Sequence, residues 1–425
     1  MSKEYQQFNE LDECLLALLR IGLRFETVEQ YSVHFSAWEQ LIEQARLQTV
    51  LPIINDAIMQ LPDDQKPPKS IVSYLKLETI NSVLSNDHLL AVQDELLAVL
   101  KAEDIPCAIL KGTSVAVYYP NPELRMQGDI DIMVDKANID RAVIAMERAG
   151  YQNSSHEHGF HKTFLKDNAR IELHHACTPV PPNKAGDFIT RLMQTAIPMA
   201  CSINIEKHVF PILTDTHQAV SLLLHMQKHI TSSGLGLRQL CDWAVFLRKV
   251  HPEQWTKNIQ AVLDHCGLLR FAEILTKACV LYLGFPSNIC PQGLQDTDDI
   301  CFALMQDFLK SGNFGRKDTV RGASSILITD YAEEEKRRPK LLIFVKSLNK
   351  NAMIHFPILQ KIPVLLPVMW VFLPLRYMVR MAIGKRPKHS PGKIMYSAKQ
   401  RDRLYSTFCL FEADNGLHSS ITHEN

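Results

Sequence analysis

Three carboxylates at short spacing are the residues of this sequence best suited to chemistry. Asp129 and Asp131 lie two positions apart in the stretch Gly-Asp-Ile-Asp-Ile-Met-Val, and Glu172 lies in Ile-Glu-Leu-His further along the chain. Residues two apart on a β-strand point to the same face, so Asp129 and Asp131 project together. Their repulsion is costly without a divalent cation or a basic neighbour. If the strand with Glu172 lies beside them, the site suits two-metal phosphoryl or nucleotidyl transfer.

A turn that could bind phosphate precedes the aspartates. Lys111, Gly112, Thr113 and Ser114 follow a short apolar run and lead into a predicted short helix. Gly112 lets the backbone approach a ligand closely, and the N–H groups that begin a helix suit a phosphate. An isolated Lys-Gly-Thr is usually a plain turn, and an isolated Asp-Ile-Asp is usually an exposed pair. Their order along the chain, followed by an acidic strand, favours the functional interpretation.

The combined pattern resembles a known superfamily. The succession L-K-G-[TS], Y-x-x-P, R-x-x-x-D-I-D-I and E-L-H is similar to the polymerase-β-like nucleotidyltransferases. Within them it is similar to a bacterial family linked to surface-polysaccharide or peptide biosynthesis. The likeness covers residues 105–175, with a weaker likeness at 224–229 and 237–243. It implies a mixed-sheet core that uses Mg²⁺ or Mn²⁺ and takes an NTP as substrate.

The resemblance also implies roles for single residues. Asp129, Asp131 and Glu172 would be the catalytic, metal-binding carboxylates, and Glu172 is in addition a candidate general base for an acceptor hydroxyl. His174 shares a strand face with Glu172, which indicates contact with the ligands or with substrate. The residues expected to bind the nucleotide are Lys111, Gly112, Thr113, Ser114, Arg125 and His174.

Histidines suggest other sites. Five of them lie close enough in the sequence to suggest a zinc site: His156, His158, His161, His174 and His175. No cysteine stands at ligand spacing among them, and two strands joined at Asp167-Asn168 explain the grouping. His225 and His229 have the i,i+4 spacing of metal ligands without an H-E-x-x-H motif. Packing of that helix face is one explanation and substrate contact is the other. G-x-S-x-G, Walker A and G-x-G-x-x-G motifs are absent.

The elements that must position these residues indicate an α+β protein. Short β-rich runs at 107–110, 130–134 and 170–174, with a helical pattern at 139–149, predict a small mixed sheet. Helical periodicity dominates on both sides of this core. We therefore expect four stretches: an N-terminal helical region (1–100), a nucleotidyltransferase core (101–212), a helical domain (213–335) and a basic, apolar C-terminal segment (336–425).

Charge is divided unevenly along the 425 residues. The formal net charge is zero, yet residues 336 to 401 contain 15 Lys and Arg and no Asp or Glu. The rest of the chain holds 31 basic and 46 acidic residues. The neutral total argues against a protein covered with nucleic-acid contacts, and no specific nucleic acid is predicted as a partner.

An uncharged run inside this basic segment, at 362–375, carries three prolines and is shorter than the roughly 20 residues of a bilayer span. It either packs against the acidic remainder of the chain or lies at a membrane surface, with Trp370 and Phe372 at head-group depth. Ten cysteines without a C-x-x-C pair, and no signal-peptide pattern, favour the cytoplasm, with peripheral contact at the inner face of the membrane as an extension.

Two classes of function follow. The first is a metal-dependent nucleotidyltransferase that moves a nucleoside monophosphate from an NTP to an unidentified acceptor. An aminoglycoside- or antitoxin-type adenylyltransferase differs from it only in the acceptor. The second is a non-catalytic nucleotide-binding or scaffold protein that keeps the same fold.

Overall fold

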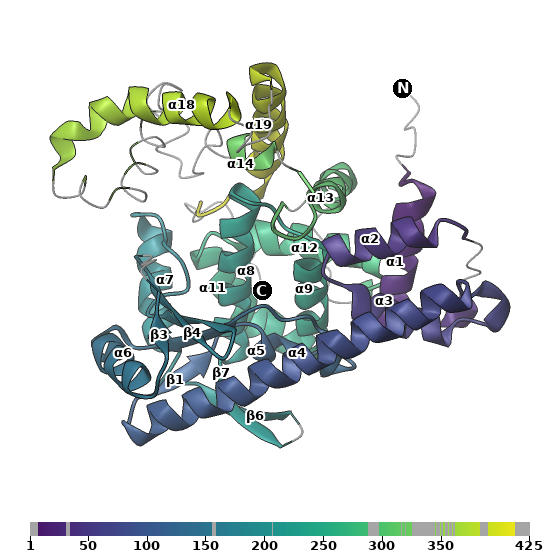
Figure 1. Cartoon of the computed structure of the whole chain (residues 1–425), viewed down its shortest axis with the longest axis horizontal. Coiled ribbons are helices and arrows are strands. Elements are labelled where there is room, and N and C mark those ends of the chain that lie inside the picture. The colour runs from purple at the N-terminus through teal and green to yellow at the C-terminus, as the bar shows by residue number, and fades with distance from the viewer. Residues whose placement is uncertain are drawn as a thin grey trace, which may run out of the picture.

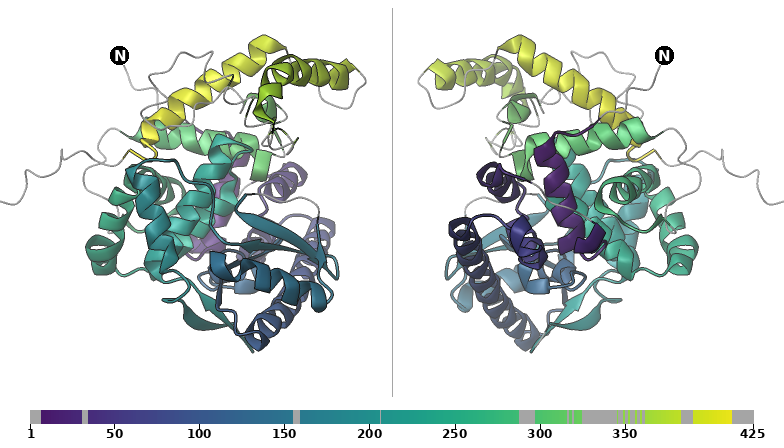
Figure 2. Two further views of the ribbon diagram at one scale, coloured as in Figure 1. Left: turned by 90° about the vertical axis from the view of Figure 1, so that its left-hand side faces the viewer. Right: turned by 90° about the vertical axis from the view of Figure 1, so that its right-hand side faces the viewer.

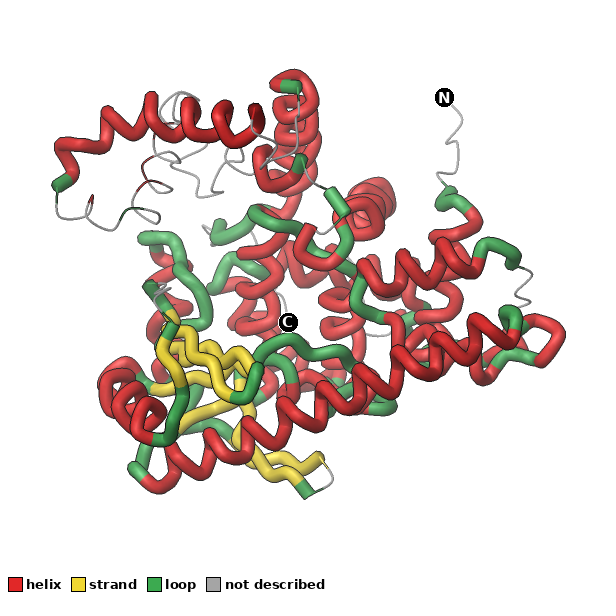
Figure 3. The backbone as a smooth tube through the Cα atoms, in the orientation of Figure 1, coloured by secondary structure: helices red, strands yellow, loops and turns green. Residues whose placement is uncertain are grey.

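Helices make up most of the part of the chain that the structure describes, and one seven-stranded sheet lies among them (Figures 1 and 3). This confirms the predicted α+β class. The structure is a computed structural model, and it describes residues 7–30, 35–154, 159–205, 207–287, 297–315, 317–318, 320–324, 362–382 and 390–412, with single residues at 345, 349, 352, 356 and 359.

The strands form one mixed sheet in the order β3-β4-β5-β2-β1-β7-β6. Pairing is parallel between β2 and β5 and between β1 and β7, and antiparallel elsewhere. The strand bounds are β1 Cys107–Ile109, β2 Ile130–Val134, β3 Gln152–Asn153, β4 His161–Lys166, β5 Ala169–His174, β6 Cys201–Ile205 and β7 His208–Ile212.

The helices described are α1 Glu10–Gly22, α2 Trp38–Leu47, α3 Leu51–Gln60, α4 Lys69–Ala102, α5 Thr113–Ala116, α6 Ile139–Arg148, α7 Lys184–Gln194, α8 Asp215–Thr231, α9 Leu237–Lys249, α10 Pro252–Gln254, α11 Gln260–His265, α12 Leu269–Leu283, α13 Asp298–Ser311, α14 Arg321–Ser324, α18 Leu366–Ala382 and α19 Pro391–Tyr405. A π-helical stretch, Trp255–Ile259, leads into α11.

The hairpin between β4 and β5 follows from its turn residues. Asp167 and Asn168 both have positive φ, 46° and 64°. Positive φ at both central residues is the geometry of a type I′ turn, whose twist matches that of two antiparallel strands. Asp and Asn are among the few residues that accept this conformation readily. The turn predicted at these two residues is therefore confirmed.

One face of the sheet is apolar because alternate strand residues point to it. Ile130, Ile132 and Val134 of β2 join Ile171 and Leu173 of β5 in one buried cluster. The C-terminal half of α4 and helix α6 cover this face, and residues of β1, β4 and β7 belong to the same cluster. The intervening residues of β2 and β5 therefore point to the opposite face, which is where the carboxylates lie.

A larger apolar core joins the N-terminal helices to those that follow the sheet. Residues of α1, α3, α8, α9, α12 and α13 belong to the same buried cluster, as does Phe408 near the C-terminus. In Figure 1 the purple N-terminal helices accordingly lie against the green and teal ones. The division of the chain into four regions remains a prediction. The packing shows in addition that helices of the N-terminal region (1–100) and of the helical domain (213–335) share one core.

The C-terminal helices α18 and α19 form a separate layer at one end of the molecule (Figures 1 and 2). Much of the predicted basic segment, including residues 336–344 and 383–389, lies outside the described residues. Within the described part of the chain, no helix combines the length and the apolar character that crossing a membrane requires.

The nine described cysteines are free thiols, as expected. Four are buried: Cys241, Cys266, Cys279 and Cys301. Cys201 is exposed, because it lies on the edge strand β6.

Candidate active site

Strand register brings the three predicted carboxylates together. β2 and β5 are parallel neighbours, and Asp131 lies directly opposite Glu172 in their pairing. Asp129 comes one residue before β2 begins. Oxygen atoms of Asp129, Asp131 and Glu172 all lie within 4.8 Å of one another. The condition stated from the sequence, that the acidic strand lies beside the Asp-x-Asp strand, is therefore met.

Burial and mutual repulsion act on these carboxylates. Burial and the neighbouring Asp131 carboxylate raise the pKa of Asp129 to about 6. Burial also raises the pKa of Asp131, but the Lys111 ammonium and a hydrogen bond from His174 outweigh it, and the net shift is downward. The same balance, with His174 as the main opposing group, lowers the pKa of Glu172 to about 2. The charged forms of Asp131 and Glu172 are therefore stabilised by Lys111 and by the hydrogen bonds from His174.

Lys111 and Gly112 enter the site from the end of β1. The backbone N–H of Leu110 donates to the Asp131 carbonyl, which extends the β1–β2 pairing up to Lys111. The Lys111 Nζ then lies 2.8 Å from Asp131 Oδ1. Gly112 has φ 66°, and a Cβ at this position would lie 3.0 Å from Gln127 Oε1. The turn therefore requires glycine, both for its backbone angle and for its close approach to Gln127.

The carboxylates form part of the wall of a cavity of about 240 Å³. Its opposite wall is made by α8 and α9. His225, Lys228 and His229 line it from one face of α8, and Arg238 and Asp242 line it from α9. The i, i+3, i+4 spacing on α8 places its three basic side chains on the same side of the helix.

The basic wall is crowded with positive charge. Burial and the nearby Lys111 lower the pKa of Lys228, and burial and Arg125 lower the pKa of Arg238. Burial, followed by Lys228, lowers the pKa of His229 to about 3. Arg238 Nε is buried and has no hydrogen-bond partner among the residues described. An anion in this cavity would relieve the repulsion among these cations.

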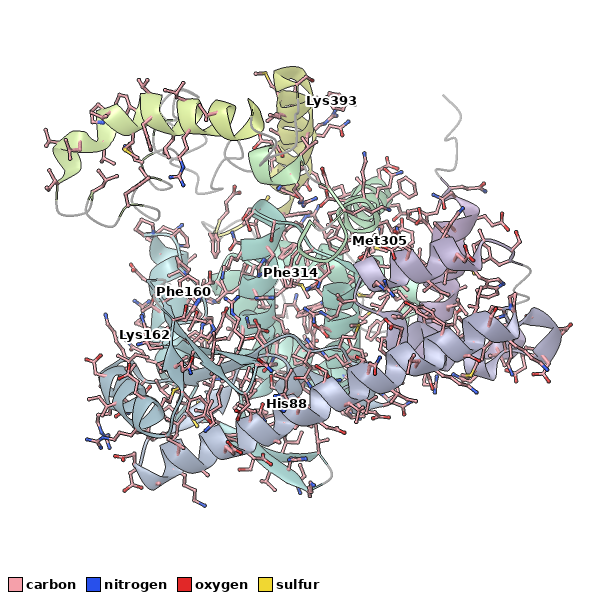
Figure 4. All side chains as sticks on the ribbon, viewed as in Figure 1. His88, Phe160, Lys162, Met305, Phe314 and Lys393 are labelled. Carbon is pink, nitrogen blue, oxygen red and sulfur yellow. The ribbon has the colours of Figure 1, made fainter. Side chains whose placement is uncertain are left out.

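Aromatic rings flank the two cations. Lys228 Nζ lies 4.5 Å from the centroid of the Phe160 ring, and Arg238 Cζ lies 5.8 Å from that of Phe314. Figure 4 labels both rings. Phe314 lines the cavity and has φ 54° and ψ 35°, a conformation that is rare for a bulky side chain. Such strain persists where the surrounding structure enforces it, and it often marks a functional site.

Arg125 lines the cavity, but its guanidinium is already paired. Its Nε and Nη2 donate to the two carboxylate oxygens of Asp242, each at 2.8 Å. The Tyr119 hydroxyl donates to the same carboxylate at 2.7 Å. Both Arg125 and Asp242 are buried. This bidentate ion pair holds the loop before the aspartates against α9. Arg125 therefore positions the loop that leads to Asp129 through its contact with Asp242.

Three residues predicted to bind the nucleotide do not line the cavity. Thr113 is buried and its hydroxyl donates to the Gln93 side chain of α4, and the Ser114 hydroxyl is buried as well. His174 lies behind the carboxylates, with Nε2 3.0 Å from Asp131 Oδ1. The helix that follows Gly112 is a single turn of four residues, too short for its N-terminus to form a phosphate site. The assignment of these three residues to nucleotide binding stays a prediction.

The central part of α4 holds the loop that leads into the aspartates. Asn86, buried within this helix, donates from Nδ2 to the carbonyls of Glu123 and Arg125. Its Oδ1 accepts from the backbone N–H of Gln127 at 3.2 Å. Asn86 therefore ties three points of the loop to one helix. Its polarity within an apolar helical pattern was the available sequence signal.

The histidines that the sequence singled out form two separate groups, one at β4 and β5 and one on α8. His161, Glu172 and His174 place ligand atoms within 4.8 Å of one another, a second grouping able to hold a metal, while His156 and His158 lie outside the described residues. The His225 and His229 rings contact each other edge to face, 4.4 Å apart. Lys111 Nζ lies 3.3 Å from His225 Nδ1. His225 and His229 therefore face the cavity. Of the two explanations left open by the sequence, helix packing and substrate contact, this position is compatible with substrate contact.

Comparison with known proteins identifies the family. A model described as an uncharacterised nucleotidyltransferase matches residues 35–284, more than half of the chain. The matched segment includes the whole sheet and every cavity residue except Phe314. The fold is thus that of a nucleotidyltransferase family. The chain is a member of the family of uncharacterised nucleotidyltransferases. A search of curated proteins finds no match.

Proposed function

We propose that this protein transfers a nucleoside monophosphate from an NTP to an acceptor hydroxyl or phosphate, with divalent metal ions at Asp129, Asp131 and Glu172. The convergence of these three carboxylates within 4.8 Å, facing a cation-lined cavity, is the observation that supports it. The sequence resemblance supports the finer assignment to the polymerase-β-like superfamily, a bacterial source and an acceptor in surface-glycan or peptide biosynthesis.

The donor set fits Mg²⁺ or Mn²⁺. All three groups offer hard carboxylate oxygens, which these ions prefer. Two of the three come from paired strands, so their separation is held by the sheet. Burial and repulsion from Asp131 raise the pKa of Asp129, and a bound cation would favour its charged form. Bound ions of this kind supply positive charge to the triphosphate and activate the attacking oxygen.

The basic wall suits the phosphates of the nucleotide. Lys228 and Arg238 face the carboxylates across the cavity, and Lys111 lies between the two walls. In the reaction, the acceptor oxygen bonds to the α-phosphorus, the bond to the bridging oxygen breaks, and pyrophosphate leaves. Lys228 and Arg238 are placed to hold the charge that develops on these phosphates.

Glu172 fits better as a ligand than as a general base. Arg170 lies 2.6 Å from its Oε1, and His174 lies 3.4 Å from its Oε2. Such neighbours stabilise the charged carboxylate and reduce its affinity for a proton. The proton of the acceptor then passes to another group or to water, which leaves the base unassigned.

Replacement of the two aspartates tests the proposal. We expect Asp129→Asn/Asp131→Asn to abolish turnover and to weaken Mg²⁺-dependent binding of NTP at least about tenfold, because two of three anionic ligands are lost. Titration calorimetry with ATP, CTP, GTP and UTP, each with Mg²⁺, measures the binding. Asp135→Asn is the matched control, since Asp135 follows β2 and does not line the cavity. Unchanged binding and turnover in the double variant would contradict the proposal.

Radiolabelled NTPs incubated with the protein and a cell extract identify the acceptor by whether label enters lipid, glycan, protein or RNA. Tight Mg-NTP binding with no labelled acceptor would instead favour the non-catalytic alternative, a nucleotide-binding or scaffold protein with this fold.

A further inference from the structure

Helix α18 carries an apolar stripe that the described protein leaves uncovered. Val368, Val371, Leu375 and Val379 are between 51% and 71% exposed. At 100° per residue these four positions lie within about 80° of one another around the helix. Val364, just before the helix, continues the same line and is 78% exposed. The stripe therefore runs the length of the helix as one continuous surface.

The other side of α18 is already packed. Met369 is buried in a small apolar cluster with Ala352 and Leu359, and Leu366 and Leu373 pack against that cluster. The Trp370 Nε1 donates to Asn349 Oδ1 at 2.7 Å, which fixes the rotation of the helix. The exposed stripe is thus a second apolar face, additional to the one that the chain uses to hold α18.

The sequence on both sides of the stripe is basic. Residues 336 to 401 contain 15 Lys and Arg and no acidic residue, whereas acidic residues predominate elsewhere. Lys393 and Lys399 are exposed on α19, the other helix of the same layer, together with the apolar Met395 and Tyr396. Figure 2 shows this layer projecting from the end of the body. Apolar and cationic surface are therefore combined at one end of the molecule.

We propose that α18 lies in the interfacial plane of a bilayer that contains anionic lipid, with its Val and Leu stripe toward the acyl chains and the flanking Lys and Arg toward the head groups. A helix that binds in this way needs an apolar face and nearby cations, and both are present. An acidic protein partner would satisfy the cations but would leave aliphatic side chains against a charged surface. The proposal is independent of the chemistry assigned to the cavity.

Flotation of the full-length protein with vesicles tests this surface. One set of vesicles is pure phosphatidylcholine, and the other contains about one third phosphatidylglycerol. We expect binding to the anionic set, and we expect it to weaken as NaCl rises from about 0.1 M to 1 M, because the Debye length falls from about 10 Å to about 3 Å. Val368→Glu/Val371→Glu should reduce the bound fraction at least about tenfold by placing charge in the stripe.

The matched control is Leu77→Glu/Leu84→Glu. These two residues are 57% and 60% exposed on α4, a helix of the body outside the C-terminal layer. This variant should bind vesicles as the unchanged protein does. Lys393→Gln/Lys399→Gln should weaken binding to anionic vesicles and leave the circular dichroism spectrum unchanged.

Three results would overturn the proposal. The first is no flotation of the unchanged protein with anionic vesicles. The second is equal loss of binding in the α4 control, which would show that the stripe on α18 has no special role. The third is self-association in light scattering that Val368→Glu/Val371→Glu abolishes, without vesicle binding, since the stripe would then join two copies of the chain. NTP binding in calorimetry stays intact in the α18 variant, which separates this test from that of the catalytic proposal.

Discussion

His174 bridges two members of the carboxylate cluster. Its Nε2 faces oxygens of Asp131 and Glu172, and its Nδ1 lies 3.2 Å from the carbonyl oxygen of Ala176. Only the imidazolium form can donate hydrogen bonds at both nitrogens. Burial lowers the pKa of His174, but the hydrogen bonds to the two carboxylates outweigh it and the net shift is upward. Through Nε2, His174 thus contacts both carboxylates and helps to hold them at their spacing.

Phe314 lines the cavity, and we expect its ring to stack on the nucleobase. We expect Phe314→Asn to raise KM for the NTP about tenfold, because stacking of a base on an aromatic ring contributes about 1–3 kcal/mol. Asn is chosen because it accepts the left-handed backbone of this residue. Steady-state kinetics measures the effect.

Phe411→Asn is the control for Phe314→Asn. Phe411 also has positive φ, 60°, and does not line the cavity. Its replacement should change the melting temperature and leave KM unchanged. An unaltered KM in Phe314→Asn would remove the proposed stacking role.

The acidic residues of the site could be predicted from the sequence, and its basic wall could not. Asp129, Asp131 and Glu172 lie on strands, where alternation assigns each side chain to a face. Lys228 and Arg238 reach the cavity only because α8 and α9 pack against the segments that follow β1 and precede β2, which no local pattern specifies. The i,i+4 histidines of α8 and the weaker family likeness at 224–229 and 237–243 were the hints that these helices face the site. Phe314 gave no signal, because its backbone strain is a property of the folded chain.

At the scale of elements, α4 serves both as part of the core and as a brace for the site. Its first half contacts α3, its C-terminal half packs on the sheet, and Asn86 between them holds the loop before the aspartates. In Figure 1 this helix runs along the whole lower side of the molecule. A single rigid element therefore connects the N-terminal helices to the position of Asp129.

Replacement of Asn86 tests that connection. We expect Asn86→Leu to lower the free energy of unfolding by about 2 kcal/mol or more, because buried carbonyl and N–H groups of the loop lose their partners. Turnover should fall as well, since the loop positions Asp129. Urea denaturation and kinetics provide the two readouts. Asn81→Leu, on the exposed side of α4, should change neither. A stable but inactive Asn86→Leu would assign the residue to positioning alone.

The sheet was more predictable than the way helices join it. Runs of β-branched and aliphatic residues marked β1, β2 and β5, and the two turn residues marked the β4–β5 hairpin. The shared core of α1, α8 and α12 depends on contacts between residues more than 200 positions apart. Such packing is decided by complementary helix surfaces, which hydrophobic periodicity in a single helix does not reveal.

For the whole molecule, a buried polar network attaches the C-terminal layer to the body. Arg321 donates to both carboxylate oxygens of Asp307, at 2.7 and 2.8 Å, and to the carbonyl of Ile230 at the end of α8. Arg401 of α19 donates to the same carbonyl at 3.3 Å. Tyr405 lies between Arg321 and Asp307 and bonds to both. The end of α8 is therefore held by Arg321 of α14 and by Arg401 of α19 in the C-terminal layer.

Loss of one partner in this network should be costly. We expect Arg321→Met to lower the free energy of unfolding by about 3–5 kcal/mol, because it leaves the Asp307 carboxylate mostly buried without its partner. Arg321→Met/Asp307→Leu should recover part of that loss, since neither charge then remains. Thermal and urea denaturation of both variants measure the difference. If the double variant is less stable than the single one by the full additive amount, the two residues are not coupled.

The family match ends at residue 284, yet two features of the working molecule come after it: Phe314, which completes a wall of the cavity, and Arg321, which holds the end of α8. The helix that presents Lys228 to the cavity is thus the one to which the C-terminal layer is attached. If residues 297–412 were replaced as a unit by those of a related chain, the preference for the NTP and the proposed binding to a bilayer would therefore change together. Related chains that exchange this block should diverge in both properties at once, while the carboxylates stay the same.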